Sequence, residues 1–298
     1  MIRKLLFLII LLQLTLFSQE NVFTRISIDG DNENQTNYKY YLGYLSDIKT
    51  NLRLGLLIGG RKYTEPGISD VYNDVRFIAK YSPLDNLSIF GNMSFLSSKD
   101  WNPFFYDCVV LYSPIDLLYF EAYIEHESVG TATTNSFQYI STSSGLSTDV
   151  NLYEDLTLVV GFTYNTISDG NIKLYQKYRA IYTLPFKWMF IDVKVKLMDG
   201  GDFNPNYFSP ESLSEYNSGI GIKSELFNSN YYLKAYIGAG VQEVGSESKG
   251  LYMGNIKFSA DLSSDISAVL SYSITNSQNK TLGYYLYHTF LFTFNYKL

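Results

Sequence analysis

One pattern recurs along almost the whole chain: segments of about ten residues in which apolar side chains alternate with polar or small ones, each followed by a break rich in Asn, Asp, Gly, Ser or Pro. Between residues 189 and 197, for example, every second side chain is apolar, and the residues between them include Asp192, Lys194 and Lys196. Successive side chains of a strand point to opposite faces. The pattern therefore predicts an all-β, transmembrane, antiparallel up-and-down β-barrel with one face in lipid and the other in water.

We expect about sixteen strands. They begin near Phe23, Tyr38, Leu52, Val71, Leu87, Phe104, Leu117, Phe137, Leu156, Ile172, Phe186, Ser218, Tyr231, Leu251, Ile266 and Tyr284. Most breaks alternate between short and long, and the long ones are 29–36, 62–70, 97–103, 128–135, 199–217 and 243–249. Short periplasmic turns and long outer loops are typical of outer-membrane barrels. The breaks at 149–155 and 168–170 fit the alternation poorly, which leaves fourteen strands as the alternative.

Both ends of the chain agree with this location. Residues 1–18 combine Arg3 and Lys4 with an apolar run too short to span a bilayer, which predicts a secretory signal peptide followed by one barrel domain over 19–298. In the last segment, Phe290, Phe292 and Phe294 share one parity and would face lipid. A soluble β-sandwich is the alternative, but it would leave this aromatic stripe uncovered. We expect outer-membrane lipid and the barrel-assembly machinery as partners.

The scarcity of metal-binding and redox residues excludes several classes of protein. The chain has a single cysteine, Cys108, and two histidines, so a disulfide framework or a zinc site is not expected. Without Arg3 and Lys4, it would carry 21 basic and 29 acidic residues, a net charge of 21 − 29 = −8. An acidic chain does not favour nucleic acid as a partner. We expect neither a metal nor a cofactor.

A barrel of this size has room for an aqueous lumen, so the inward side chains would carry its function. The expected lumen-lining residues are Arg53, Arg61, Asp74, Arg76, Lys80, Glu121, Glu125, Lys173, Tyr175, Lys177, Arg179, Asp192, Lys194, Lys196, Lys223, Glu225, Lys234 and Tyr236, together with Tyr41, Tyr72, Tyr119, Tyr123 and Tyr232. Tyrosine rings beside charged and hydroxyl groups suit sugars, which offer C–H faces and hydroxyl edges. Alternatively, the mixed charges pair with one another and keep the lumen wet and stable.

Residues 199–242 carry a resemblance to a known family. A loop ending in Tyr207-Phe208-Ser209-Pro210 precedes a strand with Tyr216 and Gly219-x-Gly221, a tight turn, and a strand with Gly238-x-Gly240-x-Gln242. This stretch resembles the C-terminal barrels of poly-N-acetylglucosamine and cellulose export porins, and stand-alone outer-membrane barrels of the YaiO type. The resemblance implies a sixteen-stranded barrel concerned with a polysaccharide or another surface polymer. The tetratricopeptide superhelix of the secretion proteins is not apparent in this sequence, so a periplasmic guide would be a separate protein.

The long break at 199–217 suggests a constriction. Its glycine and proline steps shape it without regular strand, and we expect Tyr207, Phe208, Ser209 and Pro210 to fold into or over the lumen mouth. The function expected from these features is a porin-like, non-enzymatic barrel that passes or helps export a polysaccharide. A structural barrel without transport is an alternative.

A second alternative is an outer-membrane lipid hydrolase. His126 and Ser128 are separated by one residue near the end of a predicted strand, which places both side chains on the lipid-facing side. The stretch looks like the His-x-Ser-Asn-Gly motif of phospholipase and lipid A deacylase barrels, in which histidine activates serine as a nucleophile. Here Val129 stands where that motif has asparagine, and Asn135 is a weak candidate for the orienting group.

Overall fold

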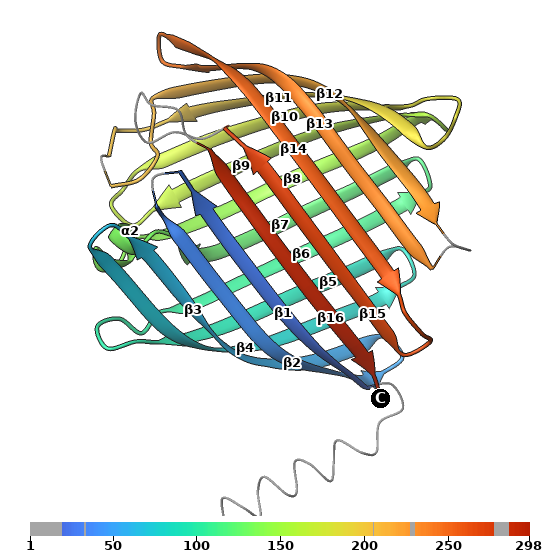
Figure 1. The fold of residues 1–298 in the computed structure, drawn as a ribbon, viewed down its shortest axis with the longest axis horizontal. Coiled ribbons are helices and arrows are strands. Elements are labelled where there is room, and N and C mark those ends of the chain that lie inside the picture. The colour runs from blue at the N-terminus through green and yellow to red at the C-terminus, as the bar shows by residue number, and fades with distance from the viewer. Residues whose placement is uncertain (1–19, 33, 205, 227–229, 277–285) are drawn as a thin grey trace, which may run out of the picture.

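The computed structural model describes residues 20–32, 34–204, 206–226, 230–276 and 286–298, which form a closed antiparallel barrel of sixteen strands (Figure 1). The elements are β1 (Glu20–Asp31), β2 (Thr36–Lys49), β3 (Leu52–Glu65), β4 (Ile68–Leu84), β5 (Leu87–Ser97), β6 (Phe104–Ile115), β7 (Leu118–Ser128), α2 (Ala132–Ser136), β8 (Ile140–Tyr153), β9 (Leu156–Ile167), β10 (Ile172–Thr183), β11 (Met189–Gly200), β12 (Ser212–Leu226), β13 (Tyr231–Val244), β14 (Glu247–Asp261), β15 (Ile266–Thr275) and β16 (Tyr287–Lys297). Each strand pairs with its neighbours in chain order, and β1 pairs with β16 to close the barrel. Within the described ranges, no helix is both long and apolar enough to cross a membrane.

The predicted sixteen-stranded, up-and-down architecture is confirmed, and the alternative of fourteen strands is wrong. Seven strands begin at the predicted residue; these are β3, β5, β6, β9, β10, β13 and β15. The predicted signal peptide, residues 1–18, lies outside the described residues.

The strand register sorts the side chains into two faces around the barrel. Lys177, for example, lies opposite Lys196 on β11 and Gly161 on β9, so these three positions share the inward face. Outward positions around the barrel expose large apolar side chains, among them Leu42 on β2 at 61%, Ile58 on β3 at 59% and Ile237 on β13 at 66%. Apolar residues at this exposure make the outer surface a lipid-facing band.

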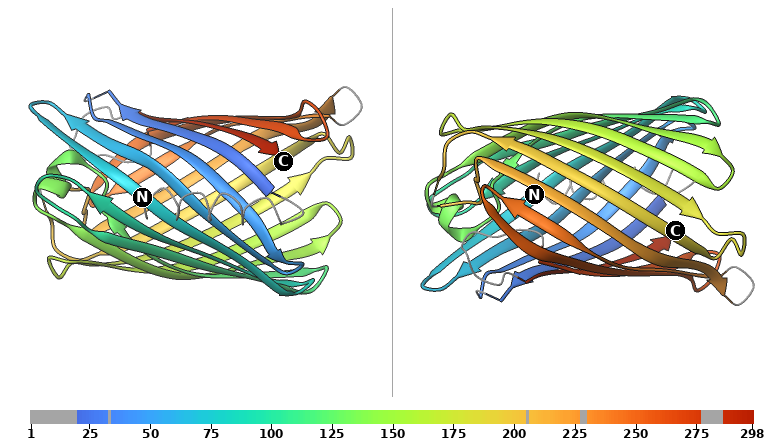
Figure 2. Two further views of the ribbon diagram at one scale, coloured as in Figure 1. Left: turned by 90° about the horizontal axis from the view of Figure 1, so that it is seen from below. Right: turned by 90° about the horizontal axis from the view of Figure 1, so that it is seen from above.

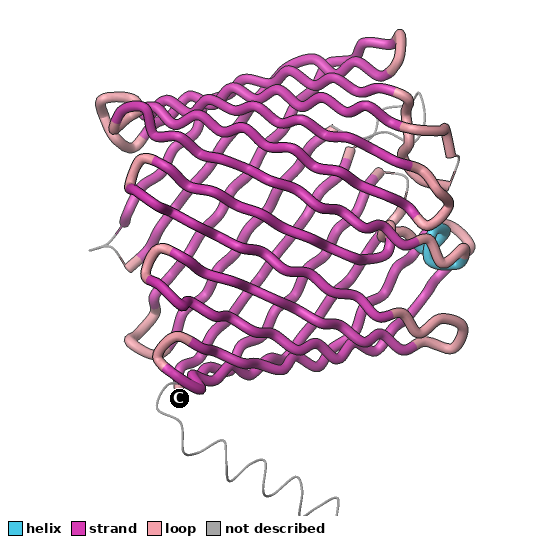
Figure 3. The backbone as a smooth tube through the Cα atoms, turned by 180° about the vertical axis from the view of Figure 1, so that it is seen from behind, coloured by secondary structure: helices cyan, strands magenta, loops and turns pink. Residues whose placement is uncertain are grey.

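The two rims of the barrel differ. The backbone N–H of Leu298 donates to the carbonyl of Glu20 at 2.8 Å, so both ends of the barrel lie on one rim. Helix α2 and the 201–211 loop lie on the opposite rim (Figure 2). The strands cross obliquely between the rims, as the backbone tube shows (Figure 3).

Several predicted loop lengths are wrong. The breaks at 62–70 and 243–249 are two-residue turns, at 66–67 and 245–246, because the flanking strands extend further than expected. The break at 199–217 shrinks to 201–211, and β8 begins at Ile140 rather than near Phe137. Beyond the lipid layer the outward face no longer needs apolar side chains, so alternation fades while strand pairing continues.

Candidate functional site

The 129–139 connection between β7 and β8 folds into the barrel mouth. It contains α2, whose N-cap Thr131 accepts a hydrogen bond from the backbone N–H of Thr134 in a capping box. Ala132 of α2 is completely buried. It packs in an apolar cluster of inward side chains from β3 to β6, namely Tyr63, Tyr72, Leu96 and Phe105. The connection therefore covers this side of the mouth.

Hydrogen bonds from β2 and β3 hold the same connection in place. The Nδ2 of Asn37 on β2 donates to the carbonyl of Gly130 at 3.0 Å. The backbone N–H of Thr133 donates to Oε2 of Glu65, at the end of β3, also at 3.0 Å, and the Thr133 hydroxyl contacts the same oxygen. These contacts bridge strands that are not neighbours in the barrel. The sequence reasoning missed this inward connection, and its capping residues are only a weak signal for one turn of helix.

The 201–211 loop is the predicted constriction loop, and the structure ties it to the hairpin between β9 and β10. The Tyr207 hydroxyl donates to Oδ2 of Asp169 at 2.6 Å and accepts from Nδ2 of Asn171 at 3.0 Å. Desolvation opposes ionisation of Asp169, but hydrogen bonds from Tyr207, the Asn171 backbone and Asn204 outweigh it and hold the pKa of Asp169 below its usual value. Tyr207 is thus anchored to a stable carboxylate at the rim.

The rest of the constriction loop continues this attachment. The Ser209 hydroxyl donates to the carbonyl of Asp202 at 2.9 Å and accepts from Asn171 at 2.8 Å. The carbonyl of Phe208 accepts from Nζ of Lys173 on β10 at 2.5 Å. Pro210 lies in the loop just before β12 and is half-buried. The loop rests on the inner side of β10.

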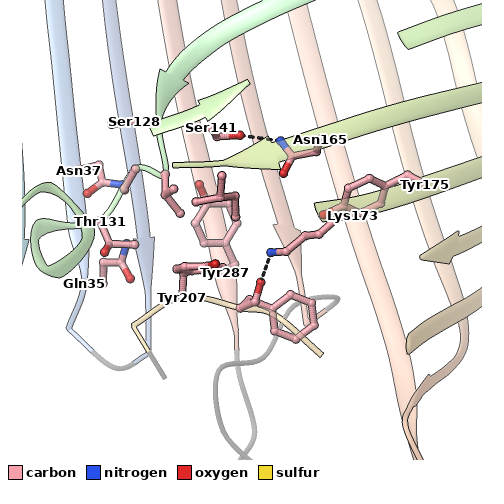
Figure 4. A pocket seen from close by; sticks show the side chains of 14 residues that line it. Gln35, Asn37, Ser128, Thr131, Ser141, Asn165, Lys173, Tyr175, Tyr207 and Tyr287 are labelled. Atoms are coloured by element: carbon pink, nitrogen blue, oxygen red, sulfur yellow. Dashed lines mark hydrogen bonds between the residues drawn. The ribbon is translucent and has the colours of Figure 1, made fainter. Parts of the chain in front are cut away.

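The two loops meet and border a cavity. The rings of Tyr139 and Tyr207 make an edge-to-face contact with centroids 5.7 Å apart. The cavity between the loops and the barrel wall has a volume of about 510 Å³ (Figure 4). Its lining includes Asn37 from β2, Asn165 from β9, and Lys173 and Tyr175 from β10. This is the candidate binding site at the mouth.

A buried ionic cluster joins several of the predicted lumen residues. Arg61 is 1% exposed and Asp74 is 0% exposed, and Nε of Arg61 donates to Oδ2 of Asp74 at 2.7 Å. The Tyr41 hydroxyl donates to the same carboxylate at 2.8 Å. Arg61 also reaches Glu127 on β7, with Nη1 and Oε1 2.5 Å apart. Because β4, β5 and β6 lie between β3 and β7, this ion pair crosses the barrel interior and connects two separate parts of the wall. Arg76 contacts both Tyr41 and Asp74 at the edge of this cluster.

The wall formed by β10 to β14 is rich in basic residues. Its inward basic residues are Lys173, Lys177, Arg179, Lys194, Lys196, Lys223, Lys234, Lys249 and Lys257, and its inward acidic residues are Asp192, Glu215, Glu225, Glu247 and Asp261. Arg179 makes a two-pronged contact with Asp192 at 2.8 and 2.6 Å. Nζ of Lys194 lies 4.1 Å from the ring centroid of Tyr236. Among the described residues, no carboxylate lies within ion-pair distance of Lys177, which is exposed to the lumen.

The neighbouring wall has the opposite character. Strands β6 to β9 contain no lysine or arginine, and their inward carboxylates are Asp107, Glu121, Glu125, Glu127 and Asp149. Another predicted lumen residue, Arg53, pairs with Asp47 near the rim that holds the chain ends. Some lumen charges are thus paired with one another, as the alternative to a solute-binding lumen requires. Lys177, Lys234 and Lys257, in contrast, make no ion pair with a described residue.

The candidate nucleophile pair is not assembled. Nδ1 of His126 lies 2.8 Å from the hydroxyl of Thr142, and its ring stacks on Tyr106 with centroids 4.9 Å apart. Ser128 lines the interior mouth cavity instead of the lipid-facing side where we expected it, because β7 ends at this residue. Within the described part of the chain, no hydrogen bond joins the two side chains, and no group of His, Cys, Asp or Glu is arranged to hold a metal.

The fold and the charged lumen together define an outer-membrane β-barrel of porin-like architecture. The barrel is similar to a protein described as a bacterial polysaccharide outer membrane secretin, with a TM-score of 0.73 and 11% identity over 94% of this chain and 98% of that chain. It is also similar to OccD3 (OpdP) of Pseudomonas aeruginosa, with a TM-score of 0.50 and 11% identity over 94% of this chain and 92% of that chain. The resemblance to a polysaccharide-export barrel is therefore confirmed at the level of fold.

Comparison of sequences alone adds no relative. No protein-family model matches the chain, and no curated protein matches it. At 11% identity the structural likeness concerns the fold and not the solute.

Proposed function

We propose that the barrel passes, or helps to export, a polysaccharide or a similar surface polymer through its lumen. The observation that carries this proposal is the row of inward basic residues on β10 to β14, of which Lys177, Lys234 and Lys257 make no ion pair with a described residue. A lumen held open only by internal ion pairs would not need unpaired charges. Lumen residues tune which solutes a barrel admits, whereas lipid-facing residues carry its stability.

Aromatic rings beside these charges support a sugar as the solute. The half-buried ring of Tyr175 has its centroid 6.0 Å from Nζ of Lys196, and Tyr232, also half-buried, shares the inward face of β13 with Lys234. Such rings can stack on the C–H faces of a sugar, while the ammonium groups bond its oxygens. A separate periplasmic protein would deliver the polymer, and the barrel-assembly machinery would insert the barrel into the membrane.

The proposal is tested by reversing charge on the basic wall. Lys177, Lys234 and Lys257 have no ion-pair partner among the described residues, so replacing all three by glutamate changes the lumen charge by six units without breaking a pair. Arg179 and Lys194 are left intact because both contact the buried carboxylate of Asp192.

The measurement is the reversal potential of single channels in planar bilayers under a salt gradient. We expect the wild-type pore to prefer anions, and the triple variant to lose or invert this preference. The control carries Lys62→Glu and Lys99→Glu, which change an outward residue of β3 and an exposed residue of the loop between β5 and β6. An unchanged reversal potential in the triple variant, or a wild-type protein that forms no channel, would remove the conduit proposal.

A further inference from the structure

The mouth cavity has the chemistry of a specific binding site. We propose that it binds a carboxylated sugar unit, with Lys173 pairing with the carboxylate and Asn37 accepting a hydrogen bond from a hydroxyl group. This inference deepens the proposed function, because it names the class of sugar that the mouth of the conduit recognises. A volume of about 510 Å³ lies within the usual range of small-molecule pockets.

Lys173 is a buried cation that makes no ion pair with any described residue, although the Asp169 carboxylate is near enough to act on its charge. Its side chain is only 5% exposed, and Nζ donates to the neutral carbonyl of Phe208 at 2.5 Å and lies 4.7 Å from the ring centroid of Tyr207. Among the described residues, no carboxylate lies within ion-pair distance of this ammonium group. A buried charge is costly unless it is paired. The carboxylate of a ligand in the cavity would supply the direct ion pair that the described residues do not provide.

Asn37 supplies an unused acceptor on the opposite side of the cavity. It is 8% exposed, and its Nδ2 is already committed to the carbonyl of Gly130. Its Oδ1 has no hydrogen-bond partner within the described part of the chain. A buried amide oxygen without a donor indicates a place for a hydroxyl or N–H group of a ligand. The labelled side chains of Figure 4 show Asn37 and Lys173 entering the cavity from separate parts of the barrel wall.

Aromatic rings distinguish a sugar from a simple anion. Tyr175, Tyr207, Phe208 and Tyr287 contribute to the cavity lining together with Lys173. Rings of this kind cover the apolar face of a sugar, and a small inorganic anion would leave them uncovered. A cation, a free acceptor and several rings within one cavity therefore match a sugar ring that carries both hydroxyl groups and a carboxylate.

Binding is best measured by titration calorimetry on the full barrel in detergent micelles. The probes are an α-1,4-linked galacturonate trimer, the neutral maltotriose, and citrate, which has carboxylates but no sugar ring. The variants are Lys173→Gln, the charge-preserving Lys173→Arg, and Lys62→Gln as a matched control outside the cavity. The shift of unheated protein on gels checks that each variant is folded.

We expect the galacturonate trimer to bind at least tenfold more tightly than maltotriose or citrate. Lys173→Gln should weaken trimer binding at least tenfold, Lys173→Arg should retain most of it, and Lys62→Gln should leave it within twofold of wild type. Equal affinity for maltotriose or citrate, or no effect of Lys173→Gln, overturns the inference. Conductance measured on the same samples separates the two proposals: trimer binding without channels contradicts only the conduit, and anion-selective channels without trimer binding contradict only this site.

Discussion

Replacing Asp74 by alanine should destabilise the folded barrel by about 3–5 kcal/mol, the usual cost of removing one partner from a buried ion pair. Asp74 is fully buried and accepts from Arg61 at 2.7 Å, from Tyr41 at 2.8 Å and from Ser94 at 2.5 Å. Hydrogen bonds to a charged group are worth about 1.5–3 kcal/mol each. The net loss is smaller than their sum because Arg61 keeps Glu127 at 2.5 Å.

The assay is equilibrium unfolding by urea of barrels refolded into lipid vesicles, followed by tryptophan fluorescence. Trp101 reports on this region because its ring contacts Phe105, which in turn lies beneath the guanidinium of Arg61. Asp47→Ala is the matched control, since Asp47 pairs with Arg53 but the two side chains are 21% and 38% exposed. Exposed pairs contribute about 1 kcal/mol or less, so the control should shift the midpoint only slightly.

A double variant makes the reasoning refutable. Arg61→Met combined with Asp74→Leu removes both charges and keeps apolar volume, and such replacements are often close to neutral. Glu127 would still have Lys39, with Nζ and Oε1 3.6 Å apart. We therefore expect the double variant to be more stable than Asp74→Ala alone. A cost below about 1 kcal/mol for Asp74→Ala, or a double variant as unstable as the sum of its single variants, would show that the pair does not behave as a buried ion pair.

Two further predictions concern the wall and the loop. In intact cells, Lys194→Cys and Lys196→Cys should react with a water-soluble thiol reagent, because both positions lie on the inward face of β11. Val193→Cys should not react, and equal labelling of all three variants would contradict this assignment of inward and outward faces. The lowered pKa of Asp169 means that its contact with Tyr207 is complete above the ordinary aspartate value of about 3.9 and is lost only as the pH falls through the lowered value. Channel conductance should therefore stay constant from about pH 8 to pH 5 and rise in stronger acid. The Asp169→Asn variant should show the raised conductance at neutral pH. A rise already at pH 5, or no effect of Asp169→Asn, would show that the contact between Asp169 and Tyr207 does not hold the loop.

The strands were predictable wherever lipid imposes a pattern. Period-two alternation located the beginnings of β3 at Leu52 and β10 at Ile172 because the outward face must be apolar across the membrane. It failed for β12, whose first residues Ser212 to Asn217 carry few apolar side chains, since this part of the strand lies towards the outer rim. The hydrogen-bonded ladder continues there without any constraint from lipid on the sequence.

The contacts inside the lumen could not be read from the sequence. Alternation assigns Arg61 and Glu125 to the inward face, but it cannot tell that Arg61 meets Glu127 across three intervening strands. Such contacts depend on the curvature and stagger of the closed barrel, which no local pattern encodes. The inward fold of the 129–139 connection depends likewise on Ala132 fitting a gap between rings from distant strands.

The glycine motif that carries the family resemblance has a packing reason. An added Cβ at Gly221 would collide with the ring of Phe190, one at Gly238 would collide with the hydroxyl of Tyr236, and one at Gly240 would strike a backbone carbonyl of β12. The rings of Phe190 and Tyr236 are nearly parallel, at 7°, with centroids 6.4 Å apart. Aromatic side chains commonly cover strand glycines in this way. Without a Cβ beneath them, these rings lie against the wall instead of projecting across the lumen. There they are only 4% and 7% exposed, and the ammonium groups of Lys234 and Lys194 lie over the rings of Phe190 and Tyr236.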